Sequence, residues 1–317
     1  MTVREVARQL GAGRLIYRTW HAPRGAITRL GKEGAVNLTL ARLGRMAMES
    51  AARHLNPLPE PTQDAPEVFY LTGRRFAYQT VFCAVSLSRQ AGQTFRFVAI
   101  DDGTLTEVDI ALLSRVLPRI RIVRRREVEA TLDTWLPPAR YPELRRRRQI
   151  YPHLCKLTDV HAGGNGWKLV LDSDMLFHRR PSFLLDWLDA PDRPCYMLDI
   201  IDAYGYSLGL LRELAGFEIP ARLNVGICGL NSSDIDWDKL EHWCAELVAR
   251  EGDHYLMEQA VVAMLVADKQ CAIAPPSTYL VAPDREAVER PNAVLHHYTA
   301  ESKAWYFRFA WRQLAAS

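Results

Sequence analysis

The chain has 317 residues, of which 48% are hydrophobic and 24% are charged, and its formal net charge is +3. That length allows one large or two smaller domains with ample core, and the small net charge argues against a nucleic-acid partner. No apolar run approaches the ~18 residues that span a bilayer, and the first residues lack the apolar segment of a signal peptide. Six scattered cysteines without a C-x-x-C pair are typical of reduced thiols, so a cytoplasmic location is expected.

Residues 1–66 form a basic segment with ten Lys/Arg and five Asp/Glu, which ends in the turn-rich NPLPEPTQDAP. Several of its apolar residues have a helical spacing: Leu38, Leu40, Leu43, Met46 and Met48. We therefore expect a mainly helical N-terminal extension over residues 1–66 and a main domain over residues 67–317. The extension would serve as a helical cap, as an acceptor-side element or as a contact to a membrane surface, and the sequence does not choose between these roles.

From residue 67 onward, apolar strands alternate with helical patterns. The predicted strands are VFYLTG (68–73), FRFVAIDDG (95–103), IRIV (120–123), KLVLDSD (168–174), CYMLDI (195–200), LNVGICGLN (223–231) and VLHHY (294–298). The predicted helices cover residues 76–89, 106–117, 153–161, 237–250 and 257–266. A polar, arginine-rich connection lies between the predicted strand at 120–123 and the predicted helix at 153–161. The arginine runs at 124–126 and 145–148 are expected to be solvated faces. The alternation predicts an α/β fold with a parallel sheet covered by crossover helices.

Two carboxylates, Asp172 and Asp174, follow the apolar strand KLVL at a spacing of one residue. Ligands of open α/β sheets bind at the carboxyl ends of parallel strands, where Thr72 and Asp101 are also expected. Like charges this close repel each other, and a divalent cation that prefers oxygen ligands would hold both. The alternative is a solvated turn, but a buried strand does not need two acids at its tip for solubility.

The run KLVLDSDMLF resembles the strand and D-x-D motif of nucleotide-sugar glycosyltransferases with the Rossmann-like GT-A fold. Four further segments resemble, in chain order, those of the retaining family 8 glycosyltransferases: VFYLTGRRFAYQTVFCAVSL, FRFVAIDDGTL, LNVGICGLN and HYTAESKAW. The resemblance covers roughly residues 67–305 and implies a mostly parallel central sheet with flanking helices. It also implies metal-dependent transfer, with retention of configuration, of a sugar from a nucleotide-diphosphate sugar, in the first place a UDP-sugar. The acceptor would be a saccharide, a lipid or a protein.

The resemblance further implies roles for individual residues. The metal, Mn²⁺ or Mg²⁺, would be held by Asp172, Asp174 and His297. His296 is the competitor of His297, because adjacent strand residues face opposite ways and only one imidazole can reach the metal. The donor would be bound by Thr72, Gly73, Phe76, Asp101, Lys156, Ser173, Gly226 and Lys303. The residues at the reacting carbon would be Gln259, Glu258 and Asn224.

Some positions depart from the family pattern. Ala300 and Ala304 replace its usual Gly and Pro, which leaves the path of the loop over the phosphates open. Arg74 and Arg75 replace acidic or amide residues and leave the nucleotide base open. The pair Glu258-Gln259 would also suit a plain helix start.

Two other functions are compatible with the same sequence. One is a nucleotidyltransferase, which also holds a metal on acids at the tip of an α/β sheet. The other is a catalytically silent protein that uses the fold to bind a partner.

Overall fold

The computed structural model describes residues 22–315, without the side chains of residues 22–35 and 38. Its centre is a seven-stranded sheet with strand order β3-β2-β1-β4-β7-β6-β8. The first four strands of this order are parallel, whereas β7 runs antiparallel to both β4 and β6. Since β6 also pairs parallel with β8, the sheet is mostly parallel, as predicted, and only its strand β7 runs the other way. Its strands are β1 (Glu67–Thr72), β2 (Arg96–Asp101), β3 (Arg121–Val123), β4 (Trp167–Leu171), β6 (Cys195–Leu198), β7 (Leu223–Asn231) and β8 (Ala272–Ile273).

A second, three-stranded sheet begins where the central sheet ends. Its order is β5-β10-β9, and its strands are β5 (Met175–Phe177), β9 (Tyr279–Val281) and β10 (Leu295–His297). β5 follows β4 after only Asp172, Ser173 and Asp174, so these three residues form the link between the two sheets. β10 pairs antiparallel with β5, and this register sets His297 opposite Met175.

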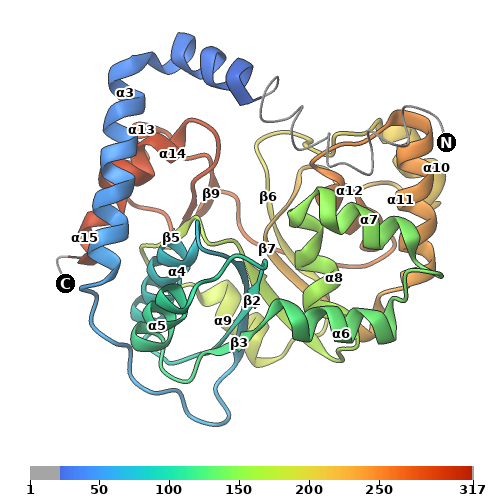
Figure 1. Cartoon of the computed structure of the whole chain (residues 1–317), viewed down its shortest axis with the longest axis horizontal. Helices are drawn as coiled ribbons and strands as arrows, with labels where there is room; N and C mark the ends of the chain where they lie inside the picture. Colours follow the sequence, from blue (N-terminus) through green and yellow to red (C-terminus); the bar gives the residue numbers. More distant parts are fainter. Residues whose placement is uncertain (1–21, 316–317) are drawn as a thin grey trace.

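Alternate residues of the central strands face two separate cores. Val68 and Tyr70 of β1 belong to one apolar cluster, whereas Phe69 between them belongs to the other. Helices cover both faces of the sheet, as Figure 1 shows, which confirms the predicted α/β architecture. The first face is covered by α4 (Ala77–Ala91), α5 (Glu107–Val116) and α9 (Ser182–Asp189). The second is covered by α6 (Arg125–Trp135), α7 (Pro142–Ile150), α8 (Cys155–His161), α10 (Leu208–Ala215), α11 (Trp237–Glu251) and α12 (Met257–Leu265).

Short elements complete the chain: η2 (Pro152–Leu154), η3 (Ser232–Asp234), α13 (Arg285–Glu289), α14 (Ser302–Trp305), the π-helical η4 (Tyr306–Ala310) and α15 (Arg312–Ala315). The long helix α3 (Ala22–Ala52) lies along the outer edge of the molecule beside α14, η4 and α15 (Figure 1). Met48 and Ala52 of α3 are fully buried in the first core, whereas Leu40, Leu43 and Met46 are exposed. The helix predicted in the N-terminal segment therefore exists, but only part of its apolar set faces the core. The domain boundary at residue 66 stays a prediction.

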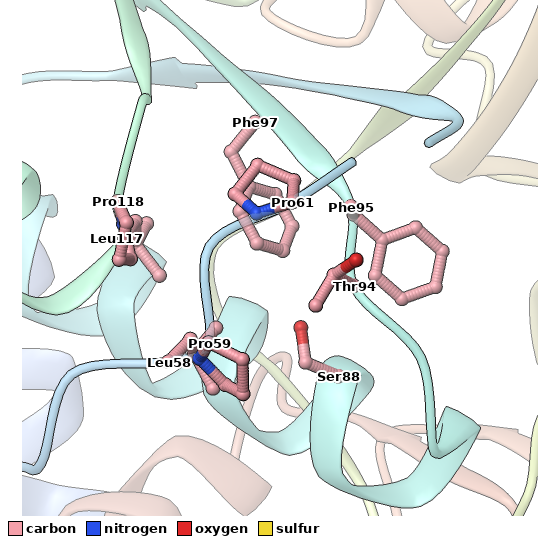
Figure 2. A pocket seen from close by; sticks show the side chains of 9 residues that line it. All are labelled: Leu58, Pro59, Pro61, Ser88, Thr94, Phe95, Phe97, Leu117 and Pro118. Atoms are coloured by element: carbon pink, nitrogen blue, oxygen red, sulfur yellow. The ribbon is translucent and has the colours of Figure 1, made fainter. Parts of the chain in front are cut away.

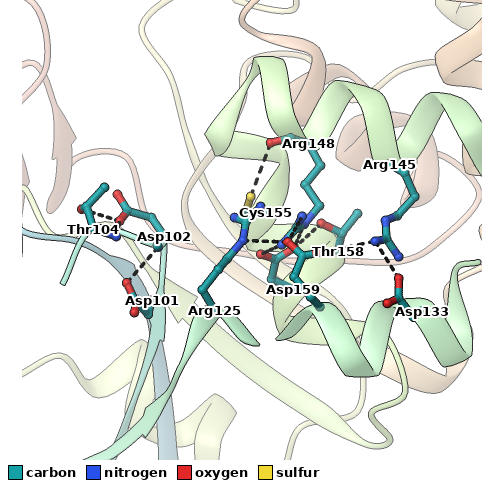
Figure 3. Close-up of polar contacts among 12 residues, drawn as sticks. Asp101, Asp102, Thr104, Arg125, Asp133, Arg145, Arg148, Cys155, Thr158 and Asp159 are labelled. Carbon is teal, nitrogen blue, oxygen red and sulfur yellow. Dashed lines mark hydrogen bonds and ion pairs between the residues drawn. The ribbon is translucent and has the colours of Figure 1, made fainter. Parts of the chain in front are cut away.

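The expectation that arginines 145–148 form a solvated face was wrong for Arg147 and Arg148, which are 0% and 1% exposed. Figure 3 shows the reason for Arg148: its Nε and Nη2 donate to Asp159 Oδ1 and Oδ2 at 2.5 and 2.8 Å. Its Nη1 also donates to Glu129 Oε1 at 2.9 Å. A guanidinium paired with two carboxylates can be buried where a single charge cannot. The arginine-rich connection is thus two helices, α6 and α7, held to α8 by ion pairs.

A small cavity lies between the segment before β1 and the strand β2, and Figure 2 shows the nine residues that line it. Its volume is about 10 Å³, room for about one water molecule. Leu58, Pro61 and Phe97 give it apolar walls, and none of the predicted site residues reaches it. This cavity is a packing gap and not the functional site that the sequence predicts.

All six cysteines are free thiols, and five of them are buried. The expected cytoplasmic location stays a prediction. Among the described helices, none combines the length and apolarity that a bilayer crossing requires.

Candidate active site

Asp172 and Asp174 lie in the link between β4 and β5, at the carboxyl end of a parallel strand. The backbone N–H of Asp172 donates to Gly226 O at 2.9 Å, and Asp174 O accepts from Tyr298 N at 2.9 Å. The link is therefore fixed by β7 on one side and by the end of β10 on the other. Both carboxylates face one side, since an oxygen of each lies within 3.5 Å of the same imidazole nitrogen of His297. They keep 26% and 17% exposure and are reachable from solvent.

His297 meets the two carboxylates from the neighbouring strand. Its Nε2 lies 3.5 Å from Asp172 Oδ2 and 3.3 Å from Asp174 Oδ1. The three potential ligand atoms all lie within 4.8 Å of one another. His296 faces the other way, with Nδ1 3.3 Å from Tyr298 Oη. The alternation of β10 thus selects His297 rather than His296 as the imidazole beside the acids.

The donor set of this cluster fits a divalent cation. Two carboxylates and one imidazole nitrogen suit Mn²⁺ or Mg²⁺, which commonly leave further coordination positions to water or phosphate oxygens. His297 is only 3% exposed, so its orientation is fixed by packing. We name Asp172, Asp174 and His297 the acid–imidazole cluster.

Gly226 of β7 makes room for the imidazole. A Cβ added at this position would lie 2.5 Å from His297 Cε1 and 2.6 Å from His297 Nδ1. Asn224 supports this part of the strand, because its Oδ1 accepts from Gly226 N at 2.9 Å. Its Nδ2 donates to Asp199 Oδ2 at 2.7 Å. The structure thus places Gly226 against the imidazole and engages both ends of the Asn224 amide; the roles assigned to them from the sequence stay predictions.

Two lysines neutralise the acids. Lys303 Nζ lies 2.9 Å from Asp174 Oδ2, and Lys156 Nζ lies 2.8 Å from Asp172 Oδ1. Burial alone would raise the pKa of Asp174, but Lys303 and His297 outweigh it and hold that pKa far below its usual value. Burial likewise disfavours the charge of Lys156, but Asp172 and Glu258 reverse this and raise its pKa. At neutral pH the site therefore holds an ionised Asp174 and a charged Lys156.

Glu258 and Gln259 open α12 beside this charge network. Lys156 Nζ lies 3.4 Å from Glu258 Oε1, so one ammonium group connects Glu258 to Asp172. Burial raises the pKa of Glu258 to about 8, with Lys156 opposing the shift and Asp172 adding to it. Gln259 is buried, and its Nε2 donates to Ala203 O at 2.8 Å. Both residues lie in the first turn of α12 and face buried polar partners, and the roles assigned to them at the reacting carbon stay predictions.

The raised pKa of Glu258 predicts a pH-dependent effect on stability. The folded protein retains the proton of Glu258 up to a pKa of about 8, whereas the unfolded chain releases it near 4.5. Between these values the fold loses stability as pH rises, because ionisation is favoured only in the unfolded state. Glu258→Gln removes this penalty. We expect the difference in melting temperature between this variant and the unchanged protein to be more favourable to the variant, by several degrees, at pH 8.5 than at pH 5. Differential scanning calorimetry measures this difference at both pH values. A difference that is the same at both would contradict the prediction.

A chain of buried hydroxyl groups runs from the first strand to the acids. Thr72 Oγ1 lies 2.8 Å from Thr80 Oγ1, which in turn lies 2.8 Å from Ser173 Oγ. Thr80 was not among the predicted site residues. Its signal in the sequence is a hydroxyl side chain in the first turn of α4, four residues after Phe76. The chain fixes Ser173 and so the spacing of the two acids that flank it.

The loops after β1 and β2 lie against each other. A Cβ on Gly73 would fall 2.1 Å from Asp102 Oδ1, so only glycine allows this approach. Asp101 Oδ1 accepts from the N–H groups of Gly103 and Leu105 at 2.8 and 3.1 Å and thus shapes its own turn. Asp101 and Asp102 are seen at the end of β2 in Figure 3. Phe76 is 41% exposed beside this loop pair. Donor binding by Gly73, Phe76 and Asp101 stays a prediction.

Ala300 stands where the family pattern has glycine, and its φ is 47°. This left-handed conformation is one that glycine adopts without strain. The loop between β10 and α14 therefore keeps a glycine-like backbone at this position despite the substitution. That backbone sets the position of Lys303 three residues later.

A mostly parallel central sheet joined at its carboxyl edge to a small second sheet matches the GT-A type of α/β fold. Solved glycosyltransferases share it. The chain is similar to the galactosyltransferase LgtC, solved with donor and acceptor sugar analogs, with a TM-score of 0.51 and 15% identity over 79% of this chain and 95% of that chain. For mouse xyloside xylosyltransferase 1 the TM-score is 0.50 and the identity 12%, over 75% and 98% of the two chains.

The bifunctional glycosyltransferase WbbM gives a TM-score of 0.52 and 13% identity, over 82% of this chain and 51% of that chain. No family model and no curated protein sequence matches the chain. The predicted resemblance to GT-A glycosyltransferases of the family 8 type is thus confirmed at the level of the fold.

Proposed function

We propose that the protein is a metal-dependent glycosyltransferase that moves a sugar from a nucleoside diphosphate sugar to an acceptor, with retention of configuration. The observation that carries the proposal is the acid–imidazole cluster. Its ligand atoms come from the link between the two sheets and from β10, and they lie within 4.8 Å of one another on a glycosyltransferase fold. Two neighbouring carboxylates repel each other, and a cation between them would relieve this repulsion when Lys303 turns to phosphate.

Asp172, Asp174 and His297 would hold Mn²⁺ or Mg²⁺. When bound, the cation neutralises the charge that develops on the departing nucleoside diphosphate. Lys303, which pairs with Asp174, would then turn toward phosphate oxygens. Lys303 is suited to this movement since its side chain is 45% exposed, whereas the 7% exposed Lys156 would act from a fixed position.

The reacting sugar would lie beside Glu258 and Gln259. A pKa of about 8 keeps Glu258 mostly protonated at neutral pH, which makes it a hydrogen-bond donor for a sugar hydroxyl rather than a nucleophile. Gln259 has no acid–base chemistry, and its hydrogen bond to Ala203 O holds the amide in one orientation. Positioned dipoles favour front-face attack, in which the acceptor adds on the face that the diphosphate leaves. Retention follows from that geometry.

The donor is a nucleotide-diphosphate sugar, and the first candidate is a UDP-sugar. The galactosyltransferase LgtC was solved with donor and acceptor sugar analogs, and we infer a saccharide-type acceptor for this chain also. The acceptor would approach from the side of Glu258 and Gln259.

The test is a panel of UDP- and GDP-sugars incubated with the full chain, with Mn²⁺, Mg²⁺ or a chelator, and with simple saccharide acceptors. We expect release of nucleoside diphosphate from one donor, dependent on the cation, and a product with the donor's anomeric configuration by proton NMR. Release of pyrophosphate instead would identify a nucleotidyltransferase. The absence of both turnover and donor-induced thermal stabilisation, with every donor, would identify a silent binding protein.

A further inference from the structure

Helix α3 has an inner face that packs on the body of the protein. A Cβ added to Gly44 would lie 2.3 Å from Phe307 O, so α3 and η4 touch backbone to backbone at this point. Met48 and Ala52, one and two turns further on, are 0% exposed. This face holds α3 against η4 and the first core, and its residues are the ones that point toward the body of the protein.

A different face of the same helix is apolar and exposed. Its residues are Val36, Leu40, Leu43 and Met46, with 73%, 39%, 56% and 60% exposure. At about 100° per residue, the first three fall within about 60° of one another around the axis, and Met46 lies about 60° beyond them. We call these four residues the outer stripe. Large side chains exposed together along two to three turns usually mark an interaction surface.

The surroundings of the outer stripe are basic. α3 contains five Lys/Arg and two Asp/Glu, and the segment 306–315 on which it packs contains two arginines and no acid. By helical position, Arg42 borders the stripe on one side. On the other side Arg308 donates to Asn37 Oδ1 at 3.1 Å, which holds a second guanidinium beside the helix. An apolar stripe between basic borders is the pattern of helices that lie in a lipid interface.

We propose that the outer stripe of α3 docks on an anionic lipid surface, with the helix parallel to the membrane plane. Charge complementarity selects this occupant. A second copy of the chain would bring the same basic helix, and residues 1–21 of the chain carry four arginines and one glutamate, also of like sign. Anionic headgroups are the partner of opposite charge that also offers an apolar layer beneath. This docking does not depend on the sugar transfer proposed above.

The test is sedimentation of the full chain with vesicles of phosphatidylcholine alone or mixed with phosphatidylglycerol. The unchanged protein should bind the mixed vesicles at about 50 mM salt and be released at about 0.5 M, where screening is strong. Leu40→Ser with Leu43→Ser should weaken binding by about tenfold or more, because two leucines no longer enter the lipid. The matched control, Val108→Ser with Ile150→Ser, alters two exposed apolar residues elsewhere and should bind unchanged.

Three results would overturn the docking: no binding to the mixed vesicles at low salt, equal binding to both vesicle types, or equal binding by the Leu40/Leu43 variant. A dimer in light scattering that the same variant converts to a monomer would assign the stripe to a second copy instead. Because the substituted leucines are exposed, the variant should keep its melting temperature. Release of nucleoside diphosphate from soluble donor should be unchanged in it, which separates this test from that of the activity.

Discussion

Asp174→Asn is expected to lower kcat/KM for the nucleotide sugar by about a thousandfold or more, because it removes a metal ligand and a partner of Lys303. Asp174 Oδ1 lies 3.3 Å from His297 and Oδ2 lies 2.9 Å from Lys303. In the asparagine variant an NH₂ group replaces one of these oxygens and faces the His297 side with its metal position or the ammonium of Lys303. Asp172→Asn should have an effect of the same order. Steady-state release of nucleoside diphosphate measures both.

The matched control is Asp189→Asn at the exposed end of α9, which carries the same change of charge away from the site. It should leave kcat/KM unaltered, and circular dichroism should show the same fold in all three variants. Full activity of Asp174→Asn after removal and return of the metal would end the assignment of this acid.

Gly226→Ala is expected to disturb the site without changing any charged group. The new methyl would lie 2.5 Å from His297 Cε1 and 2.9 Å from Asn224 Oδ1, so the imidazole must move away from the acids. Since His297 is fully enclosed, it cannot turn aside without repacking. We expect Mn²⁺ affinity to fall by about tenfold or more and activity by about a hundredfold, as for the loss of support around a metal ligand. Isothermal calorimetry and the turnover assay measure the two effects.

Gly229→Ala on the same strand is the control that separates this effect from general crowding. Its methyl would meet Cys195 Sγ and Trp187, both at 2.6 Å, on the core side of β7 and away from His297. It should lower the melting temperature but leave the affinity for Mn²⁺ unchanged. If both glycine variants lost metal binding equally, the specific role of Gly226 would be refuted.

The acid pair could be predicted from the sequence because it depends on local order: an apolar strand ends and two carboxylates follow. His297 could be predicted as a partner only through the spacing to Lys303 that the family resemblance supplied. Its choice over His296 needed the β5–β10 register. The same register explains why the link between Asp172 and Asp174 is rigid.

Other features depend on contacts between residues far apart in the chain, which local patterns do not carry. Arg148 is buried because it pairs with Glu129 and Asp159 on two other helices. The arginine-rich run itself does not show these partners, and its composition is that of a solvated face. The antiparallel direction of β7 is a matter of topology, since a buried strand has the same apolar pattern in either direction. Thr80 joined the site because α4 crosses the link between β4 and β5.

The central claim is that a divalent cation is held by Asp172, Asp174 and His297, and Mn²⁺ binding followed by electron paramagnetic resonance tests it most directly. The full chain should bind one Mn²⁺, more tightly when UDP is present, and Asp189→Asn should bind it equally well. His297→Ala and Asp174→Asn should each weaken binding by about tenfold or more. Unchanged Mn²⁺ binding in both of these variants, with their folds intact, would contradict the account.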